Sequence, residues 1–266
     1  MPKHLLALSA LSVGLVLASC SGDVPTLAGA SAANPGVGDG AALTLQAGTT
    51  PDVPGFNPFS ERPATTSGQR EVMQNPSVAE IMKPGELPEA ALGRQDAPVT
   101  IVQYASLTCP YCHKFQVEVF PVFKREYIDT GKVRYILREF PIGKTSGAAT
   151  IALRCAKPEK YLTLYGKFME QQPDWVSQEV RLDPIYKVAS QVGMTRQQFD
   201  ACRENQAMIS GLNWVKERGR KLGVIGTPNF FVGGKLVKKE LSIEDIRAMV
   251  DPLVAARTTA AAGTPH

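Results

Sequence analysis

The sequence has little of what metal sites and membrane spans require. Its 266 residues include three histidines and five cysteines. A zinc site built on Cys109 and Cys112 would need two further ligands at comparable spacing, but the other cysteines are single residues far away. The apolar stretch at residues 5–17 is shorter than the roughly 20 residues that span a bilayer. No metal site and no cofactor is therefore expected.

The chain also has only a small excess of positive over negative charge. The formal net charge is +4, and basic residues occur in short groups, as at 216–221 and 235–239, interleaved with acidic and apolar residues. Such groups are typical of solvated faces, whereas a nucleic-acid interface needs a continuous basic patch. No nucleic-acid partner is expected.

The N-terminus has the features of an export signal. Lys3 supplies a positive charge ahead of the apolar stretch, which predicts a signal peptide over residues 1–19. Residues 17–20 read Leu-Ala-Ser-Cys and resemble the lipobox of a bacterial lipoprotein, in which Cys20 becomes the lipidated first residue. The alternative is an ordinary signal peptide with Cys20 incidental. Either way we expect a protein of the periplasm or cell envelope, where disulfides persist.

Composition divides the rest of the chain into three parts. Residues 20–75 are rich in Gly, Ala, Pro, Ser and Thr with few charges, which predicts a flexible linker. Residues 76–254 are long enough for one domain with a sizeable core. Residues 255–266, rich in Ala and Thr, are expected to be a disordered tail.

A strand that leads into Cys-Pro-Tyr-Cys is the centre of that domain. Residues 99–104 form a β-branched and aromatic run of strand length. From Cys109 the apolar spacing becomes helical, and Pro110 stands in the first turn, where its missing N–H costs nothing. The backbone N–H groups of a helix start stabilise a thiolate at Cys109, with Cys112 one turn further in. A purely structural disulfide would close too small a loop to add much stability. The pair is interpreted as redox-active.

The flanking segments predict a mixed sheet interrupted by helices. Residues 132–142 form a second strand, so that strand, helix and strand make a parallel βαβ unit. Residues 145–222 contain successive helical patterns, one of which begins with a capping box at Thr195 and Gln198. Gly233 and Gly234 then mark a hairpin, and a closing helix is expected to end near residue 254.

Three strings together resemble a known family over residues 92–254. They are APVTIVQYASLTCPYC, REFP at 138–141 and VIGTPNFFVGG at 224–234. This order of parts is similar to the DsbA-like thiol:disulfide oxidoreductases of bacterial envelopes. The resemblance implies an α/β thioredoxin fold with an inserted all-helical subdomain. It also implies that Pro228 follows a cis peptide bond against the cysteines, leaving the Thr227 backbone free to pair with a substrate strand.

Two positions depart from the family pattern. The acidic residue usually found six positions before the first cysteine is replaced by Gln103, which cannot relay a proton by ionising. Tyr111 stands where strongly oxidising members often have His. A phenol brings no positive charge, so we expect a less acidic Cys109 and a milder oxidant.

Cys155 and Cys202 both fall in the predicted helical insertion. An even pair in an exported chain usually forms a disulfide, and here its role would be structural. The alternative is two free, buried thiols.

We therefore expect a monomeric, lipid-anchored enzyme that introduces disulfides into exported, cysteine-containing proteins and is reoxidised by a membrane partner. A disulfide isomerase or reductase of the same fold is the nearest alternative. Isomerases commonly oligomerise through an N-terminal stalk, for which residues 21–90 show no heptads. A copper-handling or interaction lipoprotein is the alternative from another class, but the chain has no Met-x-x-Met or histidine cluster.

Overall fold

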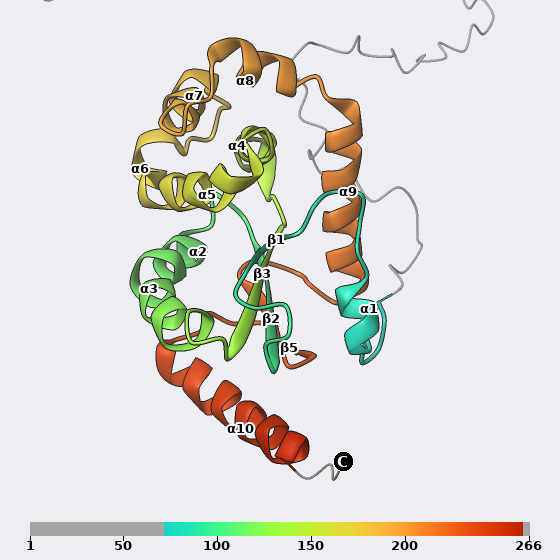
Figure 1. The fold of residues 1–266 in the computed structure, drawn as a ribbon. Coiled ribbons are helices and arrows are strands. Elements are labelled where there is room, and N and C mark those ends of the chain that lie inside the picture. Colours follow the sequence, from blue (N-terminus) through green and yellow to red (C-terminus); the bar gives the residue numbers. More distant parts are fainter. Residues whose placement is uncertain (1–71, 263–266) are drawn as a thin grey trace, which may run out of the picture. The chain divides into compact units, whose positions relative to one another are not determined.

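The computed structural model describes residues 72–262 (Figure 1). The predicted signal peptide, Cys20 and nearly all of the predicted linker lie outside these residues. Every helix between residues 72 and 262 is too short or too polar to span a bilayer.

A five-stranded mixed sheet with the order β1-β3-β2-β4-β5 forms the centre. The buried run predicted as a strand is β2 (Val99–Ala105), which pairs in parallel with β3 (Val133–Glu139). The other strands are antiparallel to their neighbours: β1 (Ala90–Leu92), β4 (Asn229–Val232) and β5 (Lys235–Val237). Gly233 and Gly234 join β4 to β5 with φ of 55° and 89°, values that glycine adopts most readily.

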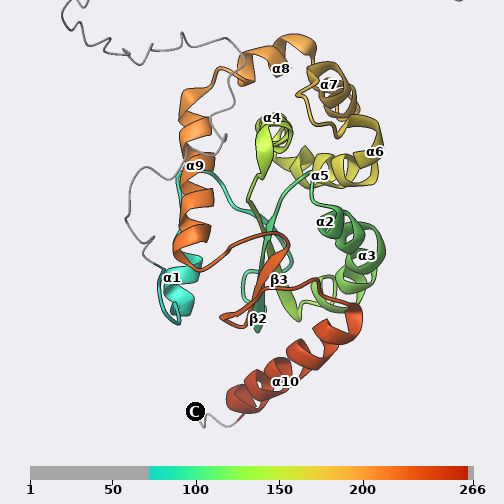
Figure 2. The same cartoon turned by 180° about the vertical axis from the view of Figure 1, so that it is seen from behind.

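Helices cover both faces of the sheet (Figures 1 and 2). One face packs against the helical segment that follows Cys109 and against α10 (Ile243–Ala262). That segment runs through α2 (Pro110–Lys114), the π-type turns η1 (Phe115–Val119) and η2 (Lys124–Ile128), and α3 (Phe120–Phe123) between them. The opposite face packs against α1 (Val78–Met82) and the end of α9 (Gln206–Lys221).

Between β3 and β4 the described chain is helical, as predicted for the insertion. The elements are α4 (Gly143–Arg154), η3 (Pro158–Lys160), α5 (Tyr161–Glu170), α6 (Gln172–Trp175), α7 (Leu182–Ser190), α8 (Arg196–Cys202) and α9. The capping box at the start of α8 is confirmed, because the Thr195 hydroxyl accepts from the Gln198 backbone and the Gln198 side chain accepts from the Thr195 backbone.

Two buried charged residues of the REFP string, Arg138 and Glu139, attach the C-terminal end of β3 to its neighbours. Glu139 accepts hydrogen bonds from the Arg154 guanidinium and from the Tyr161 hydroxyl, which ties β3 to α4 and α5. On the other face, the Arg138 guanidinium donates to the Ile81 carbonyl at 2.6 Å and to Glu89. Buried charges are stable only when paired in this way.

The structure corrects two expectations from the sequence and adds one strand. The domain begins before residue 76, because the Met73 amide donates to the Lys221 carbonyl at 2.8 Å and its side chain packs against the core. The strand β1 was not predicted, since three residues carry no readable period and β3 supplies its hydrogen bonds. The closing helix continues to Ala262 instead of ending near 254, because alanine has the highest helix propensity.

Candidate active site

Cys109 is the N-cap residue of α2, immediately after the turn that ends β2. Its Sγ accepts a hydrogen bond from the Cys112 backbone amide at 3.3 Å, and Pro110 occupies the first turn. Cys109 is 9% exposed and Cys112 is completely buried. The first sulfur is thus at the edge of the protein surface, and the second lies beneath it.

The loop before β4 lies against the first sulfur. The Thr227–Pro228 peptide bond is cis, and the Cys109 Sγ lies 3.1 Å from the Thr227 carbonyl oxygen, to which the protonated thiol donates. Residues that the sequence separates by 118 positions therefore meet at Cys109.

The two cysteines have opposite acidities. A hydrogen bond from the Cys112 side chain lowers the pKa of Cys109 to about 6, although burial acts in the opposite direction. Hydrogen bonds from the backbone of Cys112 and Tyr111 lower this pKa further. Burial, followed by the interaction with Cys109, raises the pKa of Cys112 well above its usual range. At neutral pH Cys109 is a thiolate and Cys112 a thiol, which is the arrangement that disulfide exchange at Cys109 requires.

An open groove of about 430 Å³ lies next to Thr227, the residue that contacts Cys109. It is lined by Tyr111 from α2, by residues 225–229 from the loop that contains Pro228, and by the charged residues 238–240. Tyr111 is 59% exposed and Ile225 is 78% exposed. Large apolar side chains held in solvent beside a reactive sulfur indicate a contact surface for another chain.

Gln103 lies on β2 and is completely buried. Its Oε1 accepts a 2.6 Å hydrogen bond from the Tyr135 hydroxyl on β3. Burial and then the charge of Cys112 raise the pKa of Tyr135, so the phenol stays protonated and the pair is close enough to Cys112 to respond to its charge. Gln103 is therefore held in a buried polar pair with Tyr135, and it is Tyr135 whose pKa responds to Cys112.

Two contacts from the helical insertion hold the active-site turn, and the sequence analysis missed both. The Gln172 side-chain amide donates to the carbonyl oxygens of Leu107 at 2.7 Å and Cys109 at 3.1 Å. His113 Nδ1 lies 2.6 Å from the Met169 carbonyl oxygen, which can only accept, so this nitrogen carries the proton. No local motif marks these residues, because their partners lie more than 50 positions away.

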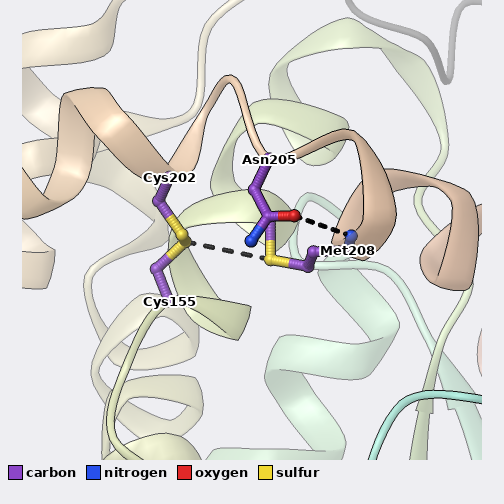
Figure 3. Close-up of a disulfide and its surroundings, with 4 residues drawn as sticks. All are labelled: Cys155, Cys202, Asn205 and Met208. Atoms are coloured by element: carbon purple, nitrogen blue, oxygen red, sulfur yellow. Dashed lines mark hydrogen bonds between the residues drawn. A yellow bond between two sulfur atoms is a disulfide. The ribbon is translucent and has the colours of Figure 1, made fainter.

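Cys155 and Cys202 form a disulfide between the ends of α4 and α8, with Cα atoms 6.0 Å apart (Figure 3). The Cys155 sulfur lies 3.9 Å from the Met208 sulfur at the start of α9, where the Asn205 side chain accepts from the Met208 amide. The cross-link joins helices of the insertion. In the described part of the chain, no group of three His, Cys, Asp or Glu side chains is arranged to hold a metal ion.

Comparisons with known proteins agree with this geometry. The sequence model of the thioredoxin family matches residues 86–252. A Rickettsia bellii protein named as a protein-disulfide oxidoreductase is 27% identical over 197 residues, which cover 71% of this chain and 74% of that protein. Disulfide bond formation protein D of Bacillus subtilis is 25% identical over 170 residues, 61% of this chain and 76% of that protein. The crystal structure of Wolbachia pipientis alpha-DsbA1 matches with a TM-score of 0.63 and 26% identity, covering 70% of this chain and 100% of that one. The chain therefore belongs to the thioredoxin family, within which it is a thiol:disulfide oxidoreductase of the DsbA type.

Proposed function

We propose that Cys109 and Cys112 are the redox pair of this enzyme and that it forms disulfides in exported proteins. The observation that carries the proposal is the position of Cys109 at the start of α2, where its Sγ accepts from the Cys112 amide while Cys112 itself is completely buried. The lowered pKa of Cys109 and the raised pKa of Cys112 agree with this geometry. A thiol of low pKa is a good leaving group. A second substrate thiolate can therefore displace Cys109 from a mixed disulfide, which leaves a disulfide in the substrate.

The reaction begins with the oxidised enzyme. A substrate thiolate attacks Cys109 Sγ, the Cys109–Cys112 bond breaks, and its electron pair leaves on Cys112, which then takes a proton. A second substrate thiolate attacks the substrate sulfur of the mixed disulfide and expels Cys109 as a thiolate. The substrate is oxidised by two electrons, and the enzyme is reduced to its dithiol form.

Substrate binding is assigned to the groove beside Cys109. An extended, unfolded segment with apolar side chains would pack against Tyr111 and Ile225 while its cysteine reaches the sulfur. Thr227 and Pro228 would form the wall against which this segment lies.

We further propose that the enzyme works in the periplasm, anchored to a membrane through a lipid on Cys20. A flexible linker of about 55 residues would have a mean reach of about 40 Å, enough to carry the domain to diverse substrates. Reoxidation would fall to a membrane redox partner, and the enzyme would act as a monomer.

Three assays run in parallel test the proposal: oxidation of a reduced protein, reactivation of a protein with scrambled disulfides, and reduction of insulin. We expect the first to be the fastest and to be lost in Cys109→Ser. Tyr111→Ala serves as a control that keeps the sulfur chemistry but weakens substrate contact. Faster reactivation than oxidation would reassign the enzyme as an isomerase. Inactivity in all three would reject the proposal in favour of a binding protein.

A further inference from the structure

Some buried polar side-chain atoms in the described part of the chain have no hydrogen-bond partner. In the described part of the chain, four buried side-chain atoms make no hydrogen bond, and three of them belong to Gln103, Tyr165 and Thr227. Buried polar groups are paired almost everywhere in folded proteins, so each exception calls for an explanation. A donor that is idle in one state of an active site is available for a charge that forms in another.

Tyr165 is the exception that the proposed reaction does not yet use. It lies on α5, is 4% exposed, and belongs to the same core cluster as Cys112. Met169, one turn further along α5, accepts the hydrogen bond from His113, which directly follows Cys112. Residues four apart lie on one face of a helix, so Tyr165 faces the active-site helix too.

The electrostatics agree with this placement. Burial raises the pKa of Tyr165 well above its usual range, and electrostatic interactions with the neighbouring ionisable side chains raise it further; those neighbours are Tyr135, Cys112, Tyr161 and Cys109. The phenol therefore keeps its proton when a thiolate forms beside it, and it acts as a hydrogen-bond donor without giving up the proton.

The opening of the Cys109–Cys112 disulfide is a step that such a hydrogen-bond donor would assist. When a substrate thiolate opens the Cys109–Cys112 disulfide, the electron pair leaves on a sulfur that is completely buried. An unpaired charge in that position is costly, and hydrogen bonds to it stabilise the transition state in which it develops.

We propose that Tyr165 is a further catalytic residue whose hydroxyl donates a hydrogen bond to the Cys112 sulfur as it leaves. One S–S bond breaks and one forms, the negative charge passes from the substrate sulfur to Cys112, and that thiolate is later protonated from water. The inference rests on the proposed roles of Cys109 and Cys112.

Tyr165→Phe tests the inference, since it removes only an oxygen that has no partner. Tyr161→Phe is the matched control, because Tyr161 lies one turn earlier on α5, is equally buried, and already donates to Glu139. The oxidised full chain is mixed with reduced glutathione, quenched with acid, and followed by mass spectrometry to give the rate at which the Cys109–Cys112 disulfide opens.

We expect Tyr165→Phe to open about tenfold more slowly than the unmodified protein and Tyr161→Phe to open within about twofold of it. The equilibrium constant with glutathione is expected to stay within about twofold in Tyr165→Phe, because Cys112 is uncharged in both end states at neutral pH. A purely structural role would not separate the rate from the equilibrium in this way.

An unchanged rate in Tyr165→Phe, or equal slowing in both variants, overturns the inference alone. A wild-type disulfide that does not react with thiols overturns the proposed function and the inference with it. If Tyr165→Phe fails to fold, a 3-fluorotyrosine at position 165 keeps the ring and strengthens the donor. That protein is expected to open its disulfide faster than wild type, and a slower or equal rate contradicts the inference.

Discussion

The thiol of Cys109 lies 3.1 Å from the backbone carbonyl oxygen of Thr227, a residue that directly precedes β4 at the far end of the helical insertion. This contact brings two distant parts of the chain together at the candidate active site. Thr227 also lines the groove at Tyr111 and Ile225, so one residue contacts both Cys109 and the groove.

Cys109 is expected to be the cysteine of the domain that an alkylating agent modifies first. Its pKa of about 6 makes it a thiolate at neutral pH, whereas Cys112 is completely buried with a raised pKa. A short pulse of iodoacetamide on protein held in mild reductant, followed by peptide mass spectrometry, measures the order. Faster labelling of Cys112 or Cys155 would contradict the assignment.

The stability of the reduced protein should rise with pH. The folded pKa of Cys109, about 6, lies below its ordinary value of 9.0, so the unfolded chain binds more protons between these values. The stabilisation is fully present above pH 9 and is lost as the pH falls toward 6, at up to about 1.4 kcal/mol per pH unit. Urea unfolding of reduced and oxidised protein at several pH values gives the difference. Cys109→Ser should abolish the slope, and a flat profile in the unmodified protein would contradict the lowered pKa.

Removal of the second disulfide should weaken the fold and spare the chemistry. The Cys155–Cys202 bond closes a separation of 47 residues within the helical insertion. By the loop-entropy estimate, the double Ala variant loses about 2–4 kcal/mol of unfolding free energy. Its rate of thiol exchange at Cys109 should stay close to wild type. Free thiols at both positions in protein taken from an oxidising compartment would refute the cross-link.

The sequence predicts those parts of the fold and the site that depend on neighbouring residues or on a periodic hydrophobic pattern. Strand β2, the helix start at Cys109, the parallel βαβ unit and the hairpin at Gly233 follow from periodicity and turn chemistry. Gln172 and Met169 were missed because their roles depend on contacts across more than 50 positions, which no local pattern encodes. The length of α10 was underestimated because an alanine-rich end reads equally well as a helix and as a tail.

Gln103→Glu tests how the second cysteine exchanges its proton. The side chain is completely buried and already accepts from Tyr135, whose pKa is raised in part by Cys112. Burial would raise the pKa of the introduced carboxyl, which could then pass a proton to Cys112 as the disulfide opens. We expect faster turnover near neutral pH and a stability loss of about 1–3 kcal/mol.

Stopped-flow measurement of thiol exchange for both forms from pH 5 to 9 gives the comparison, with Gln103→Met as an apolar control of similar size. Identical rates and pH profiles for Gln103→Glu and the unmodified protein would mean that this position only packs.

The central claim is that the fold makes Cys109 an acidic, reactive thiol, and a titration of thiolate absorbance in the ultraviolet tests it most directly. The reduced protein should show a transition with a midpoint near pH 6 that is absent from Cys109→Ser and retained in Cys112→Ser. In Cys112→Ala the midpoint should lie higher, because that change removes the side-chain hydrogen bond that contributes most to the lowered pKa of Cys109. A first transition near the ordinary thiol value of 9.0, or one that persists in Cys109→Ser, would contradict the account.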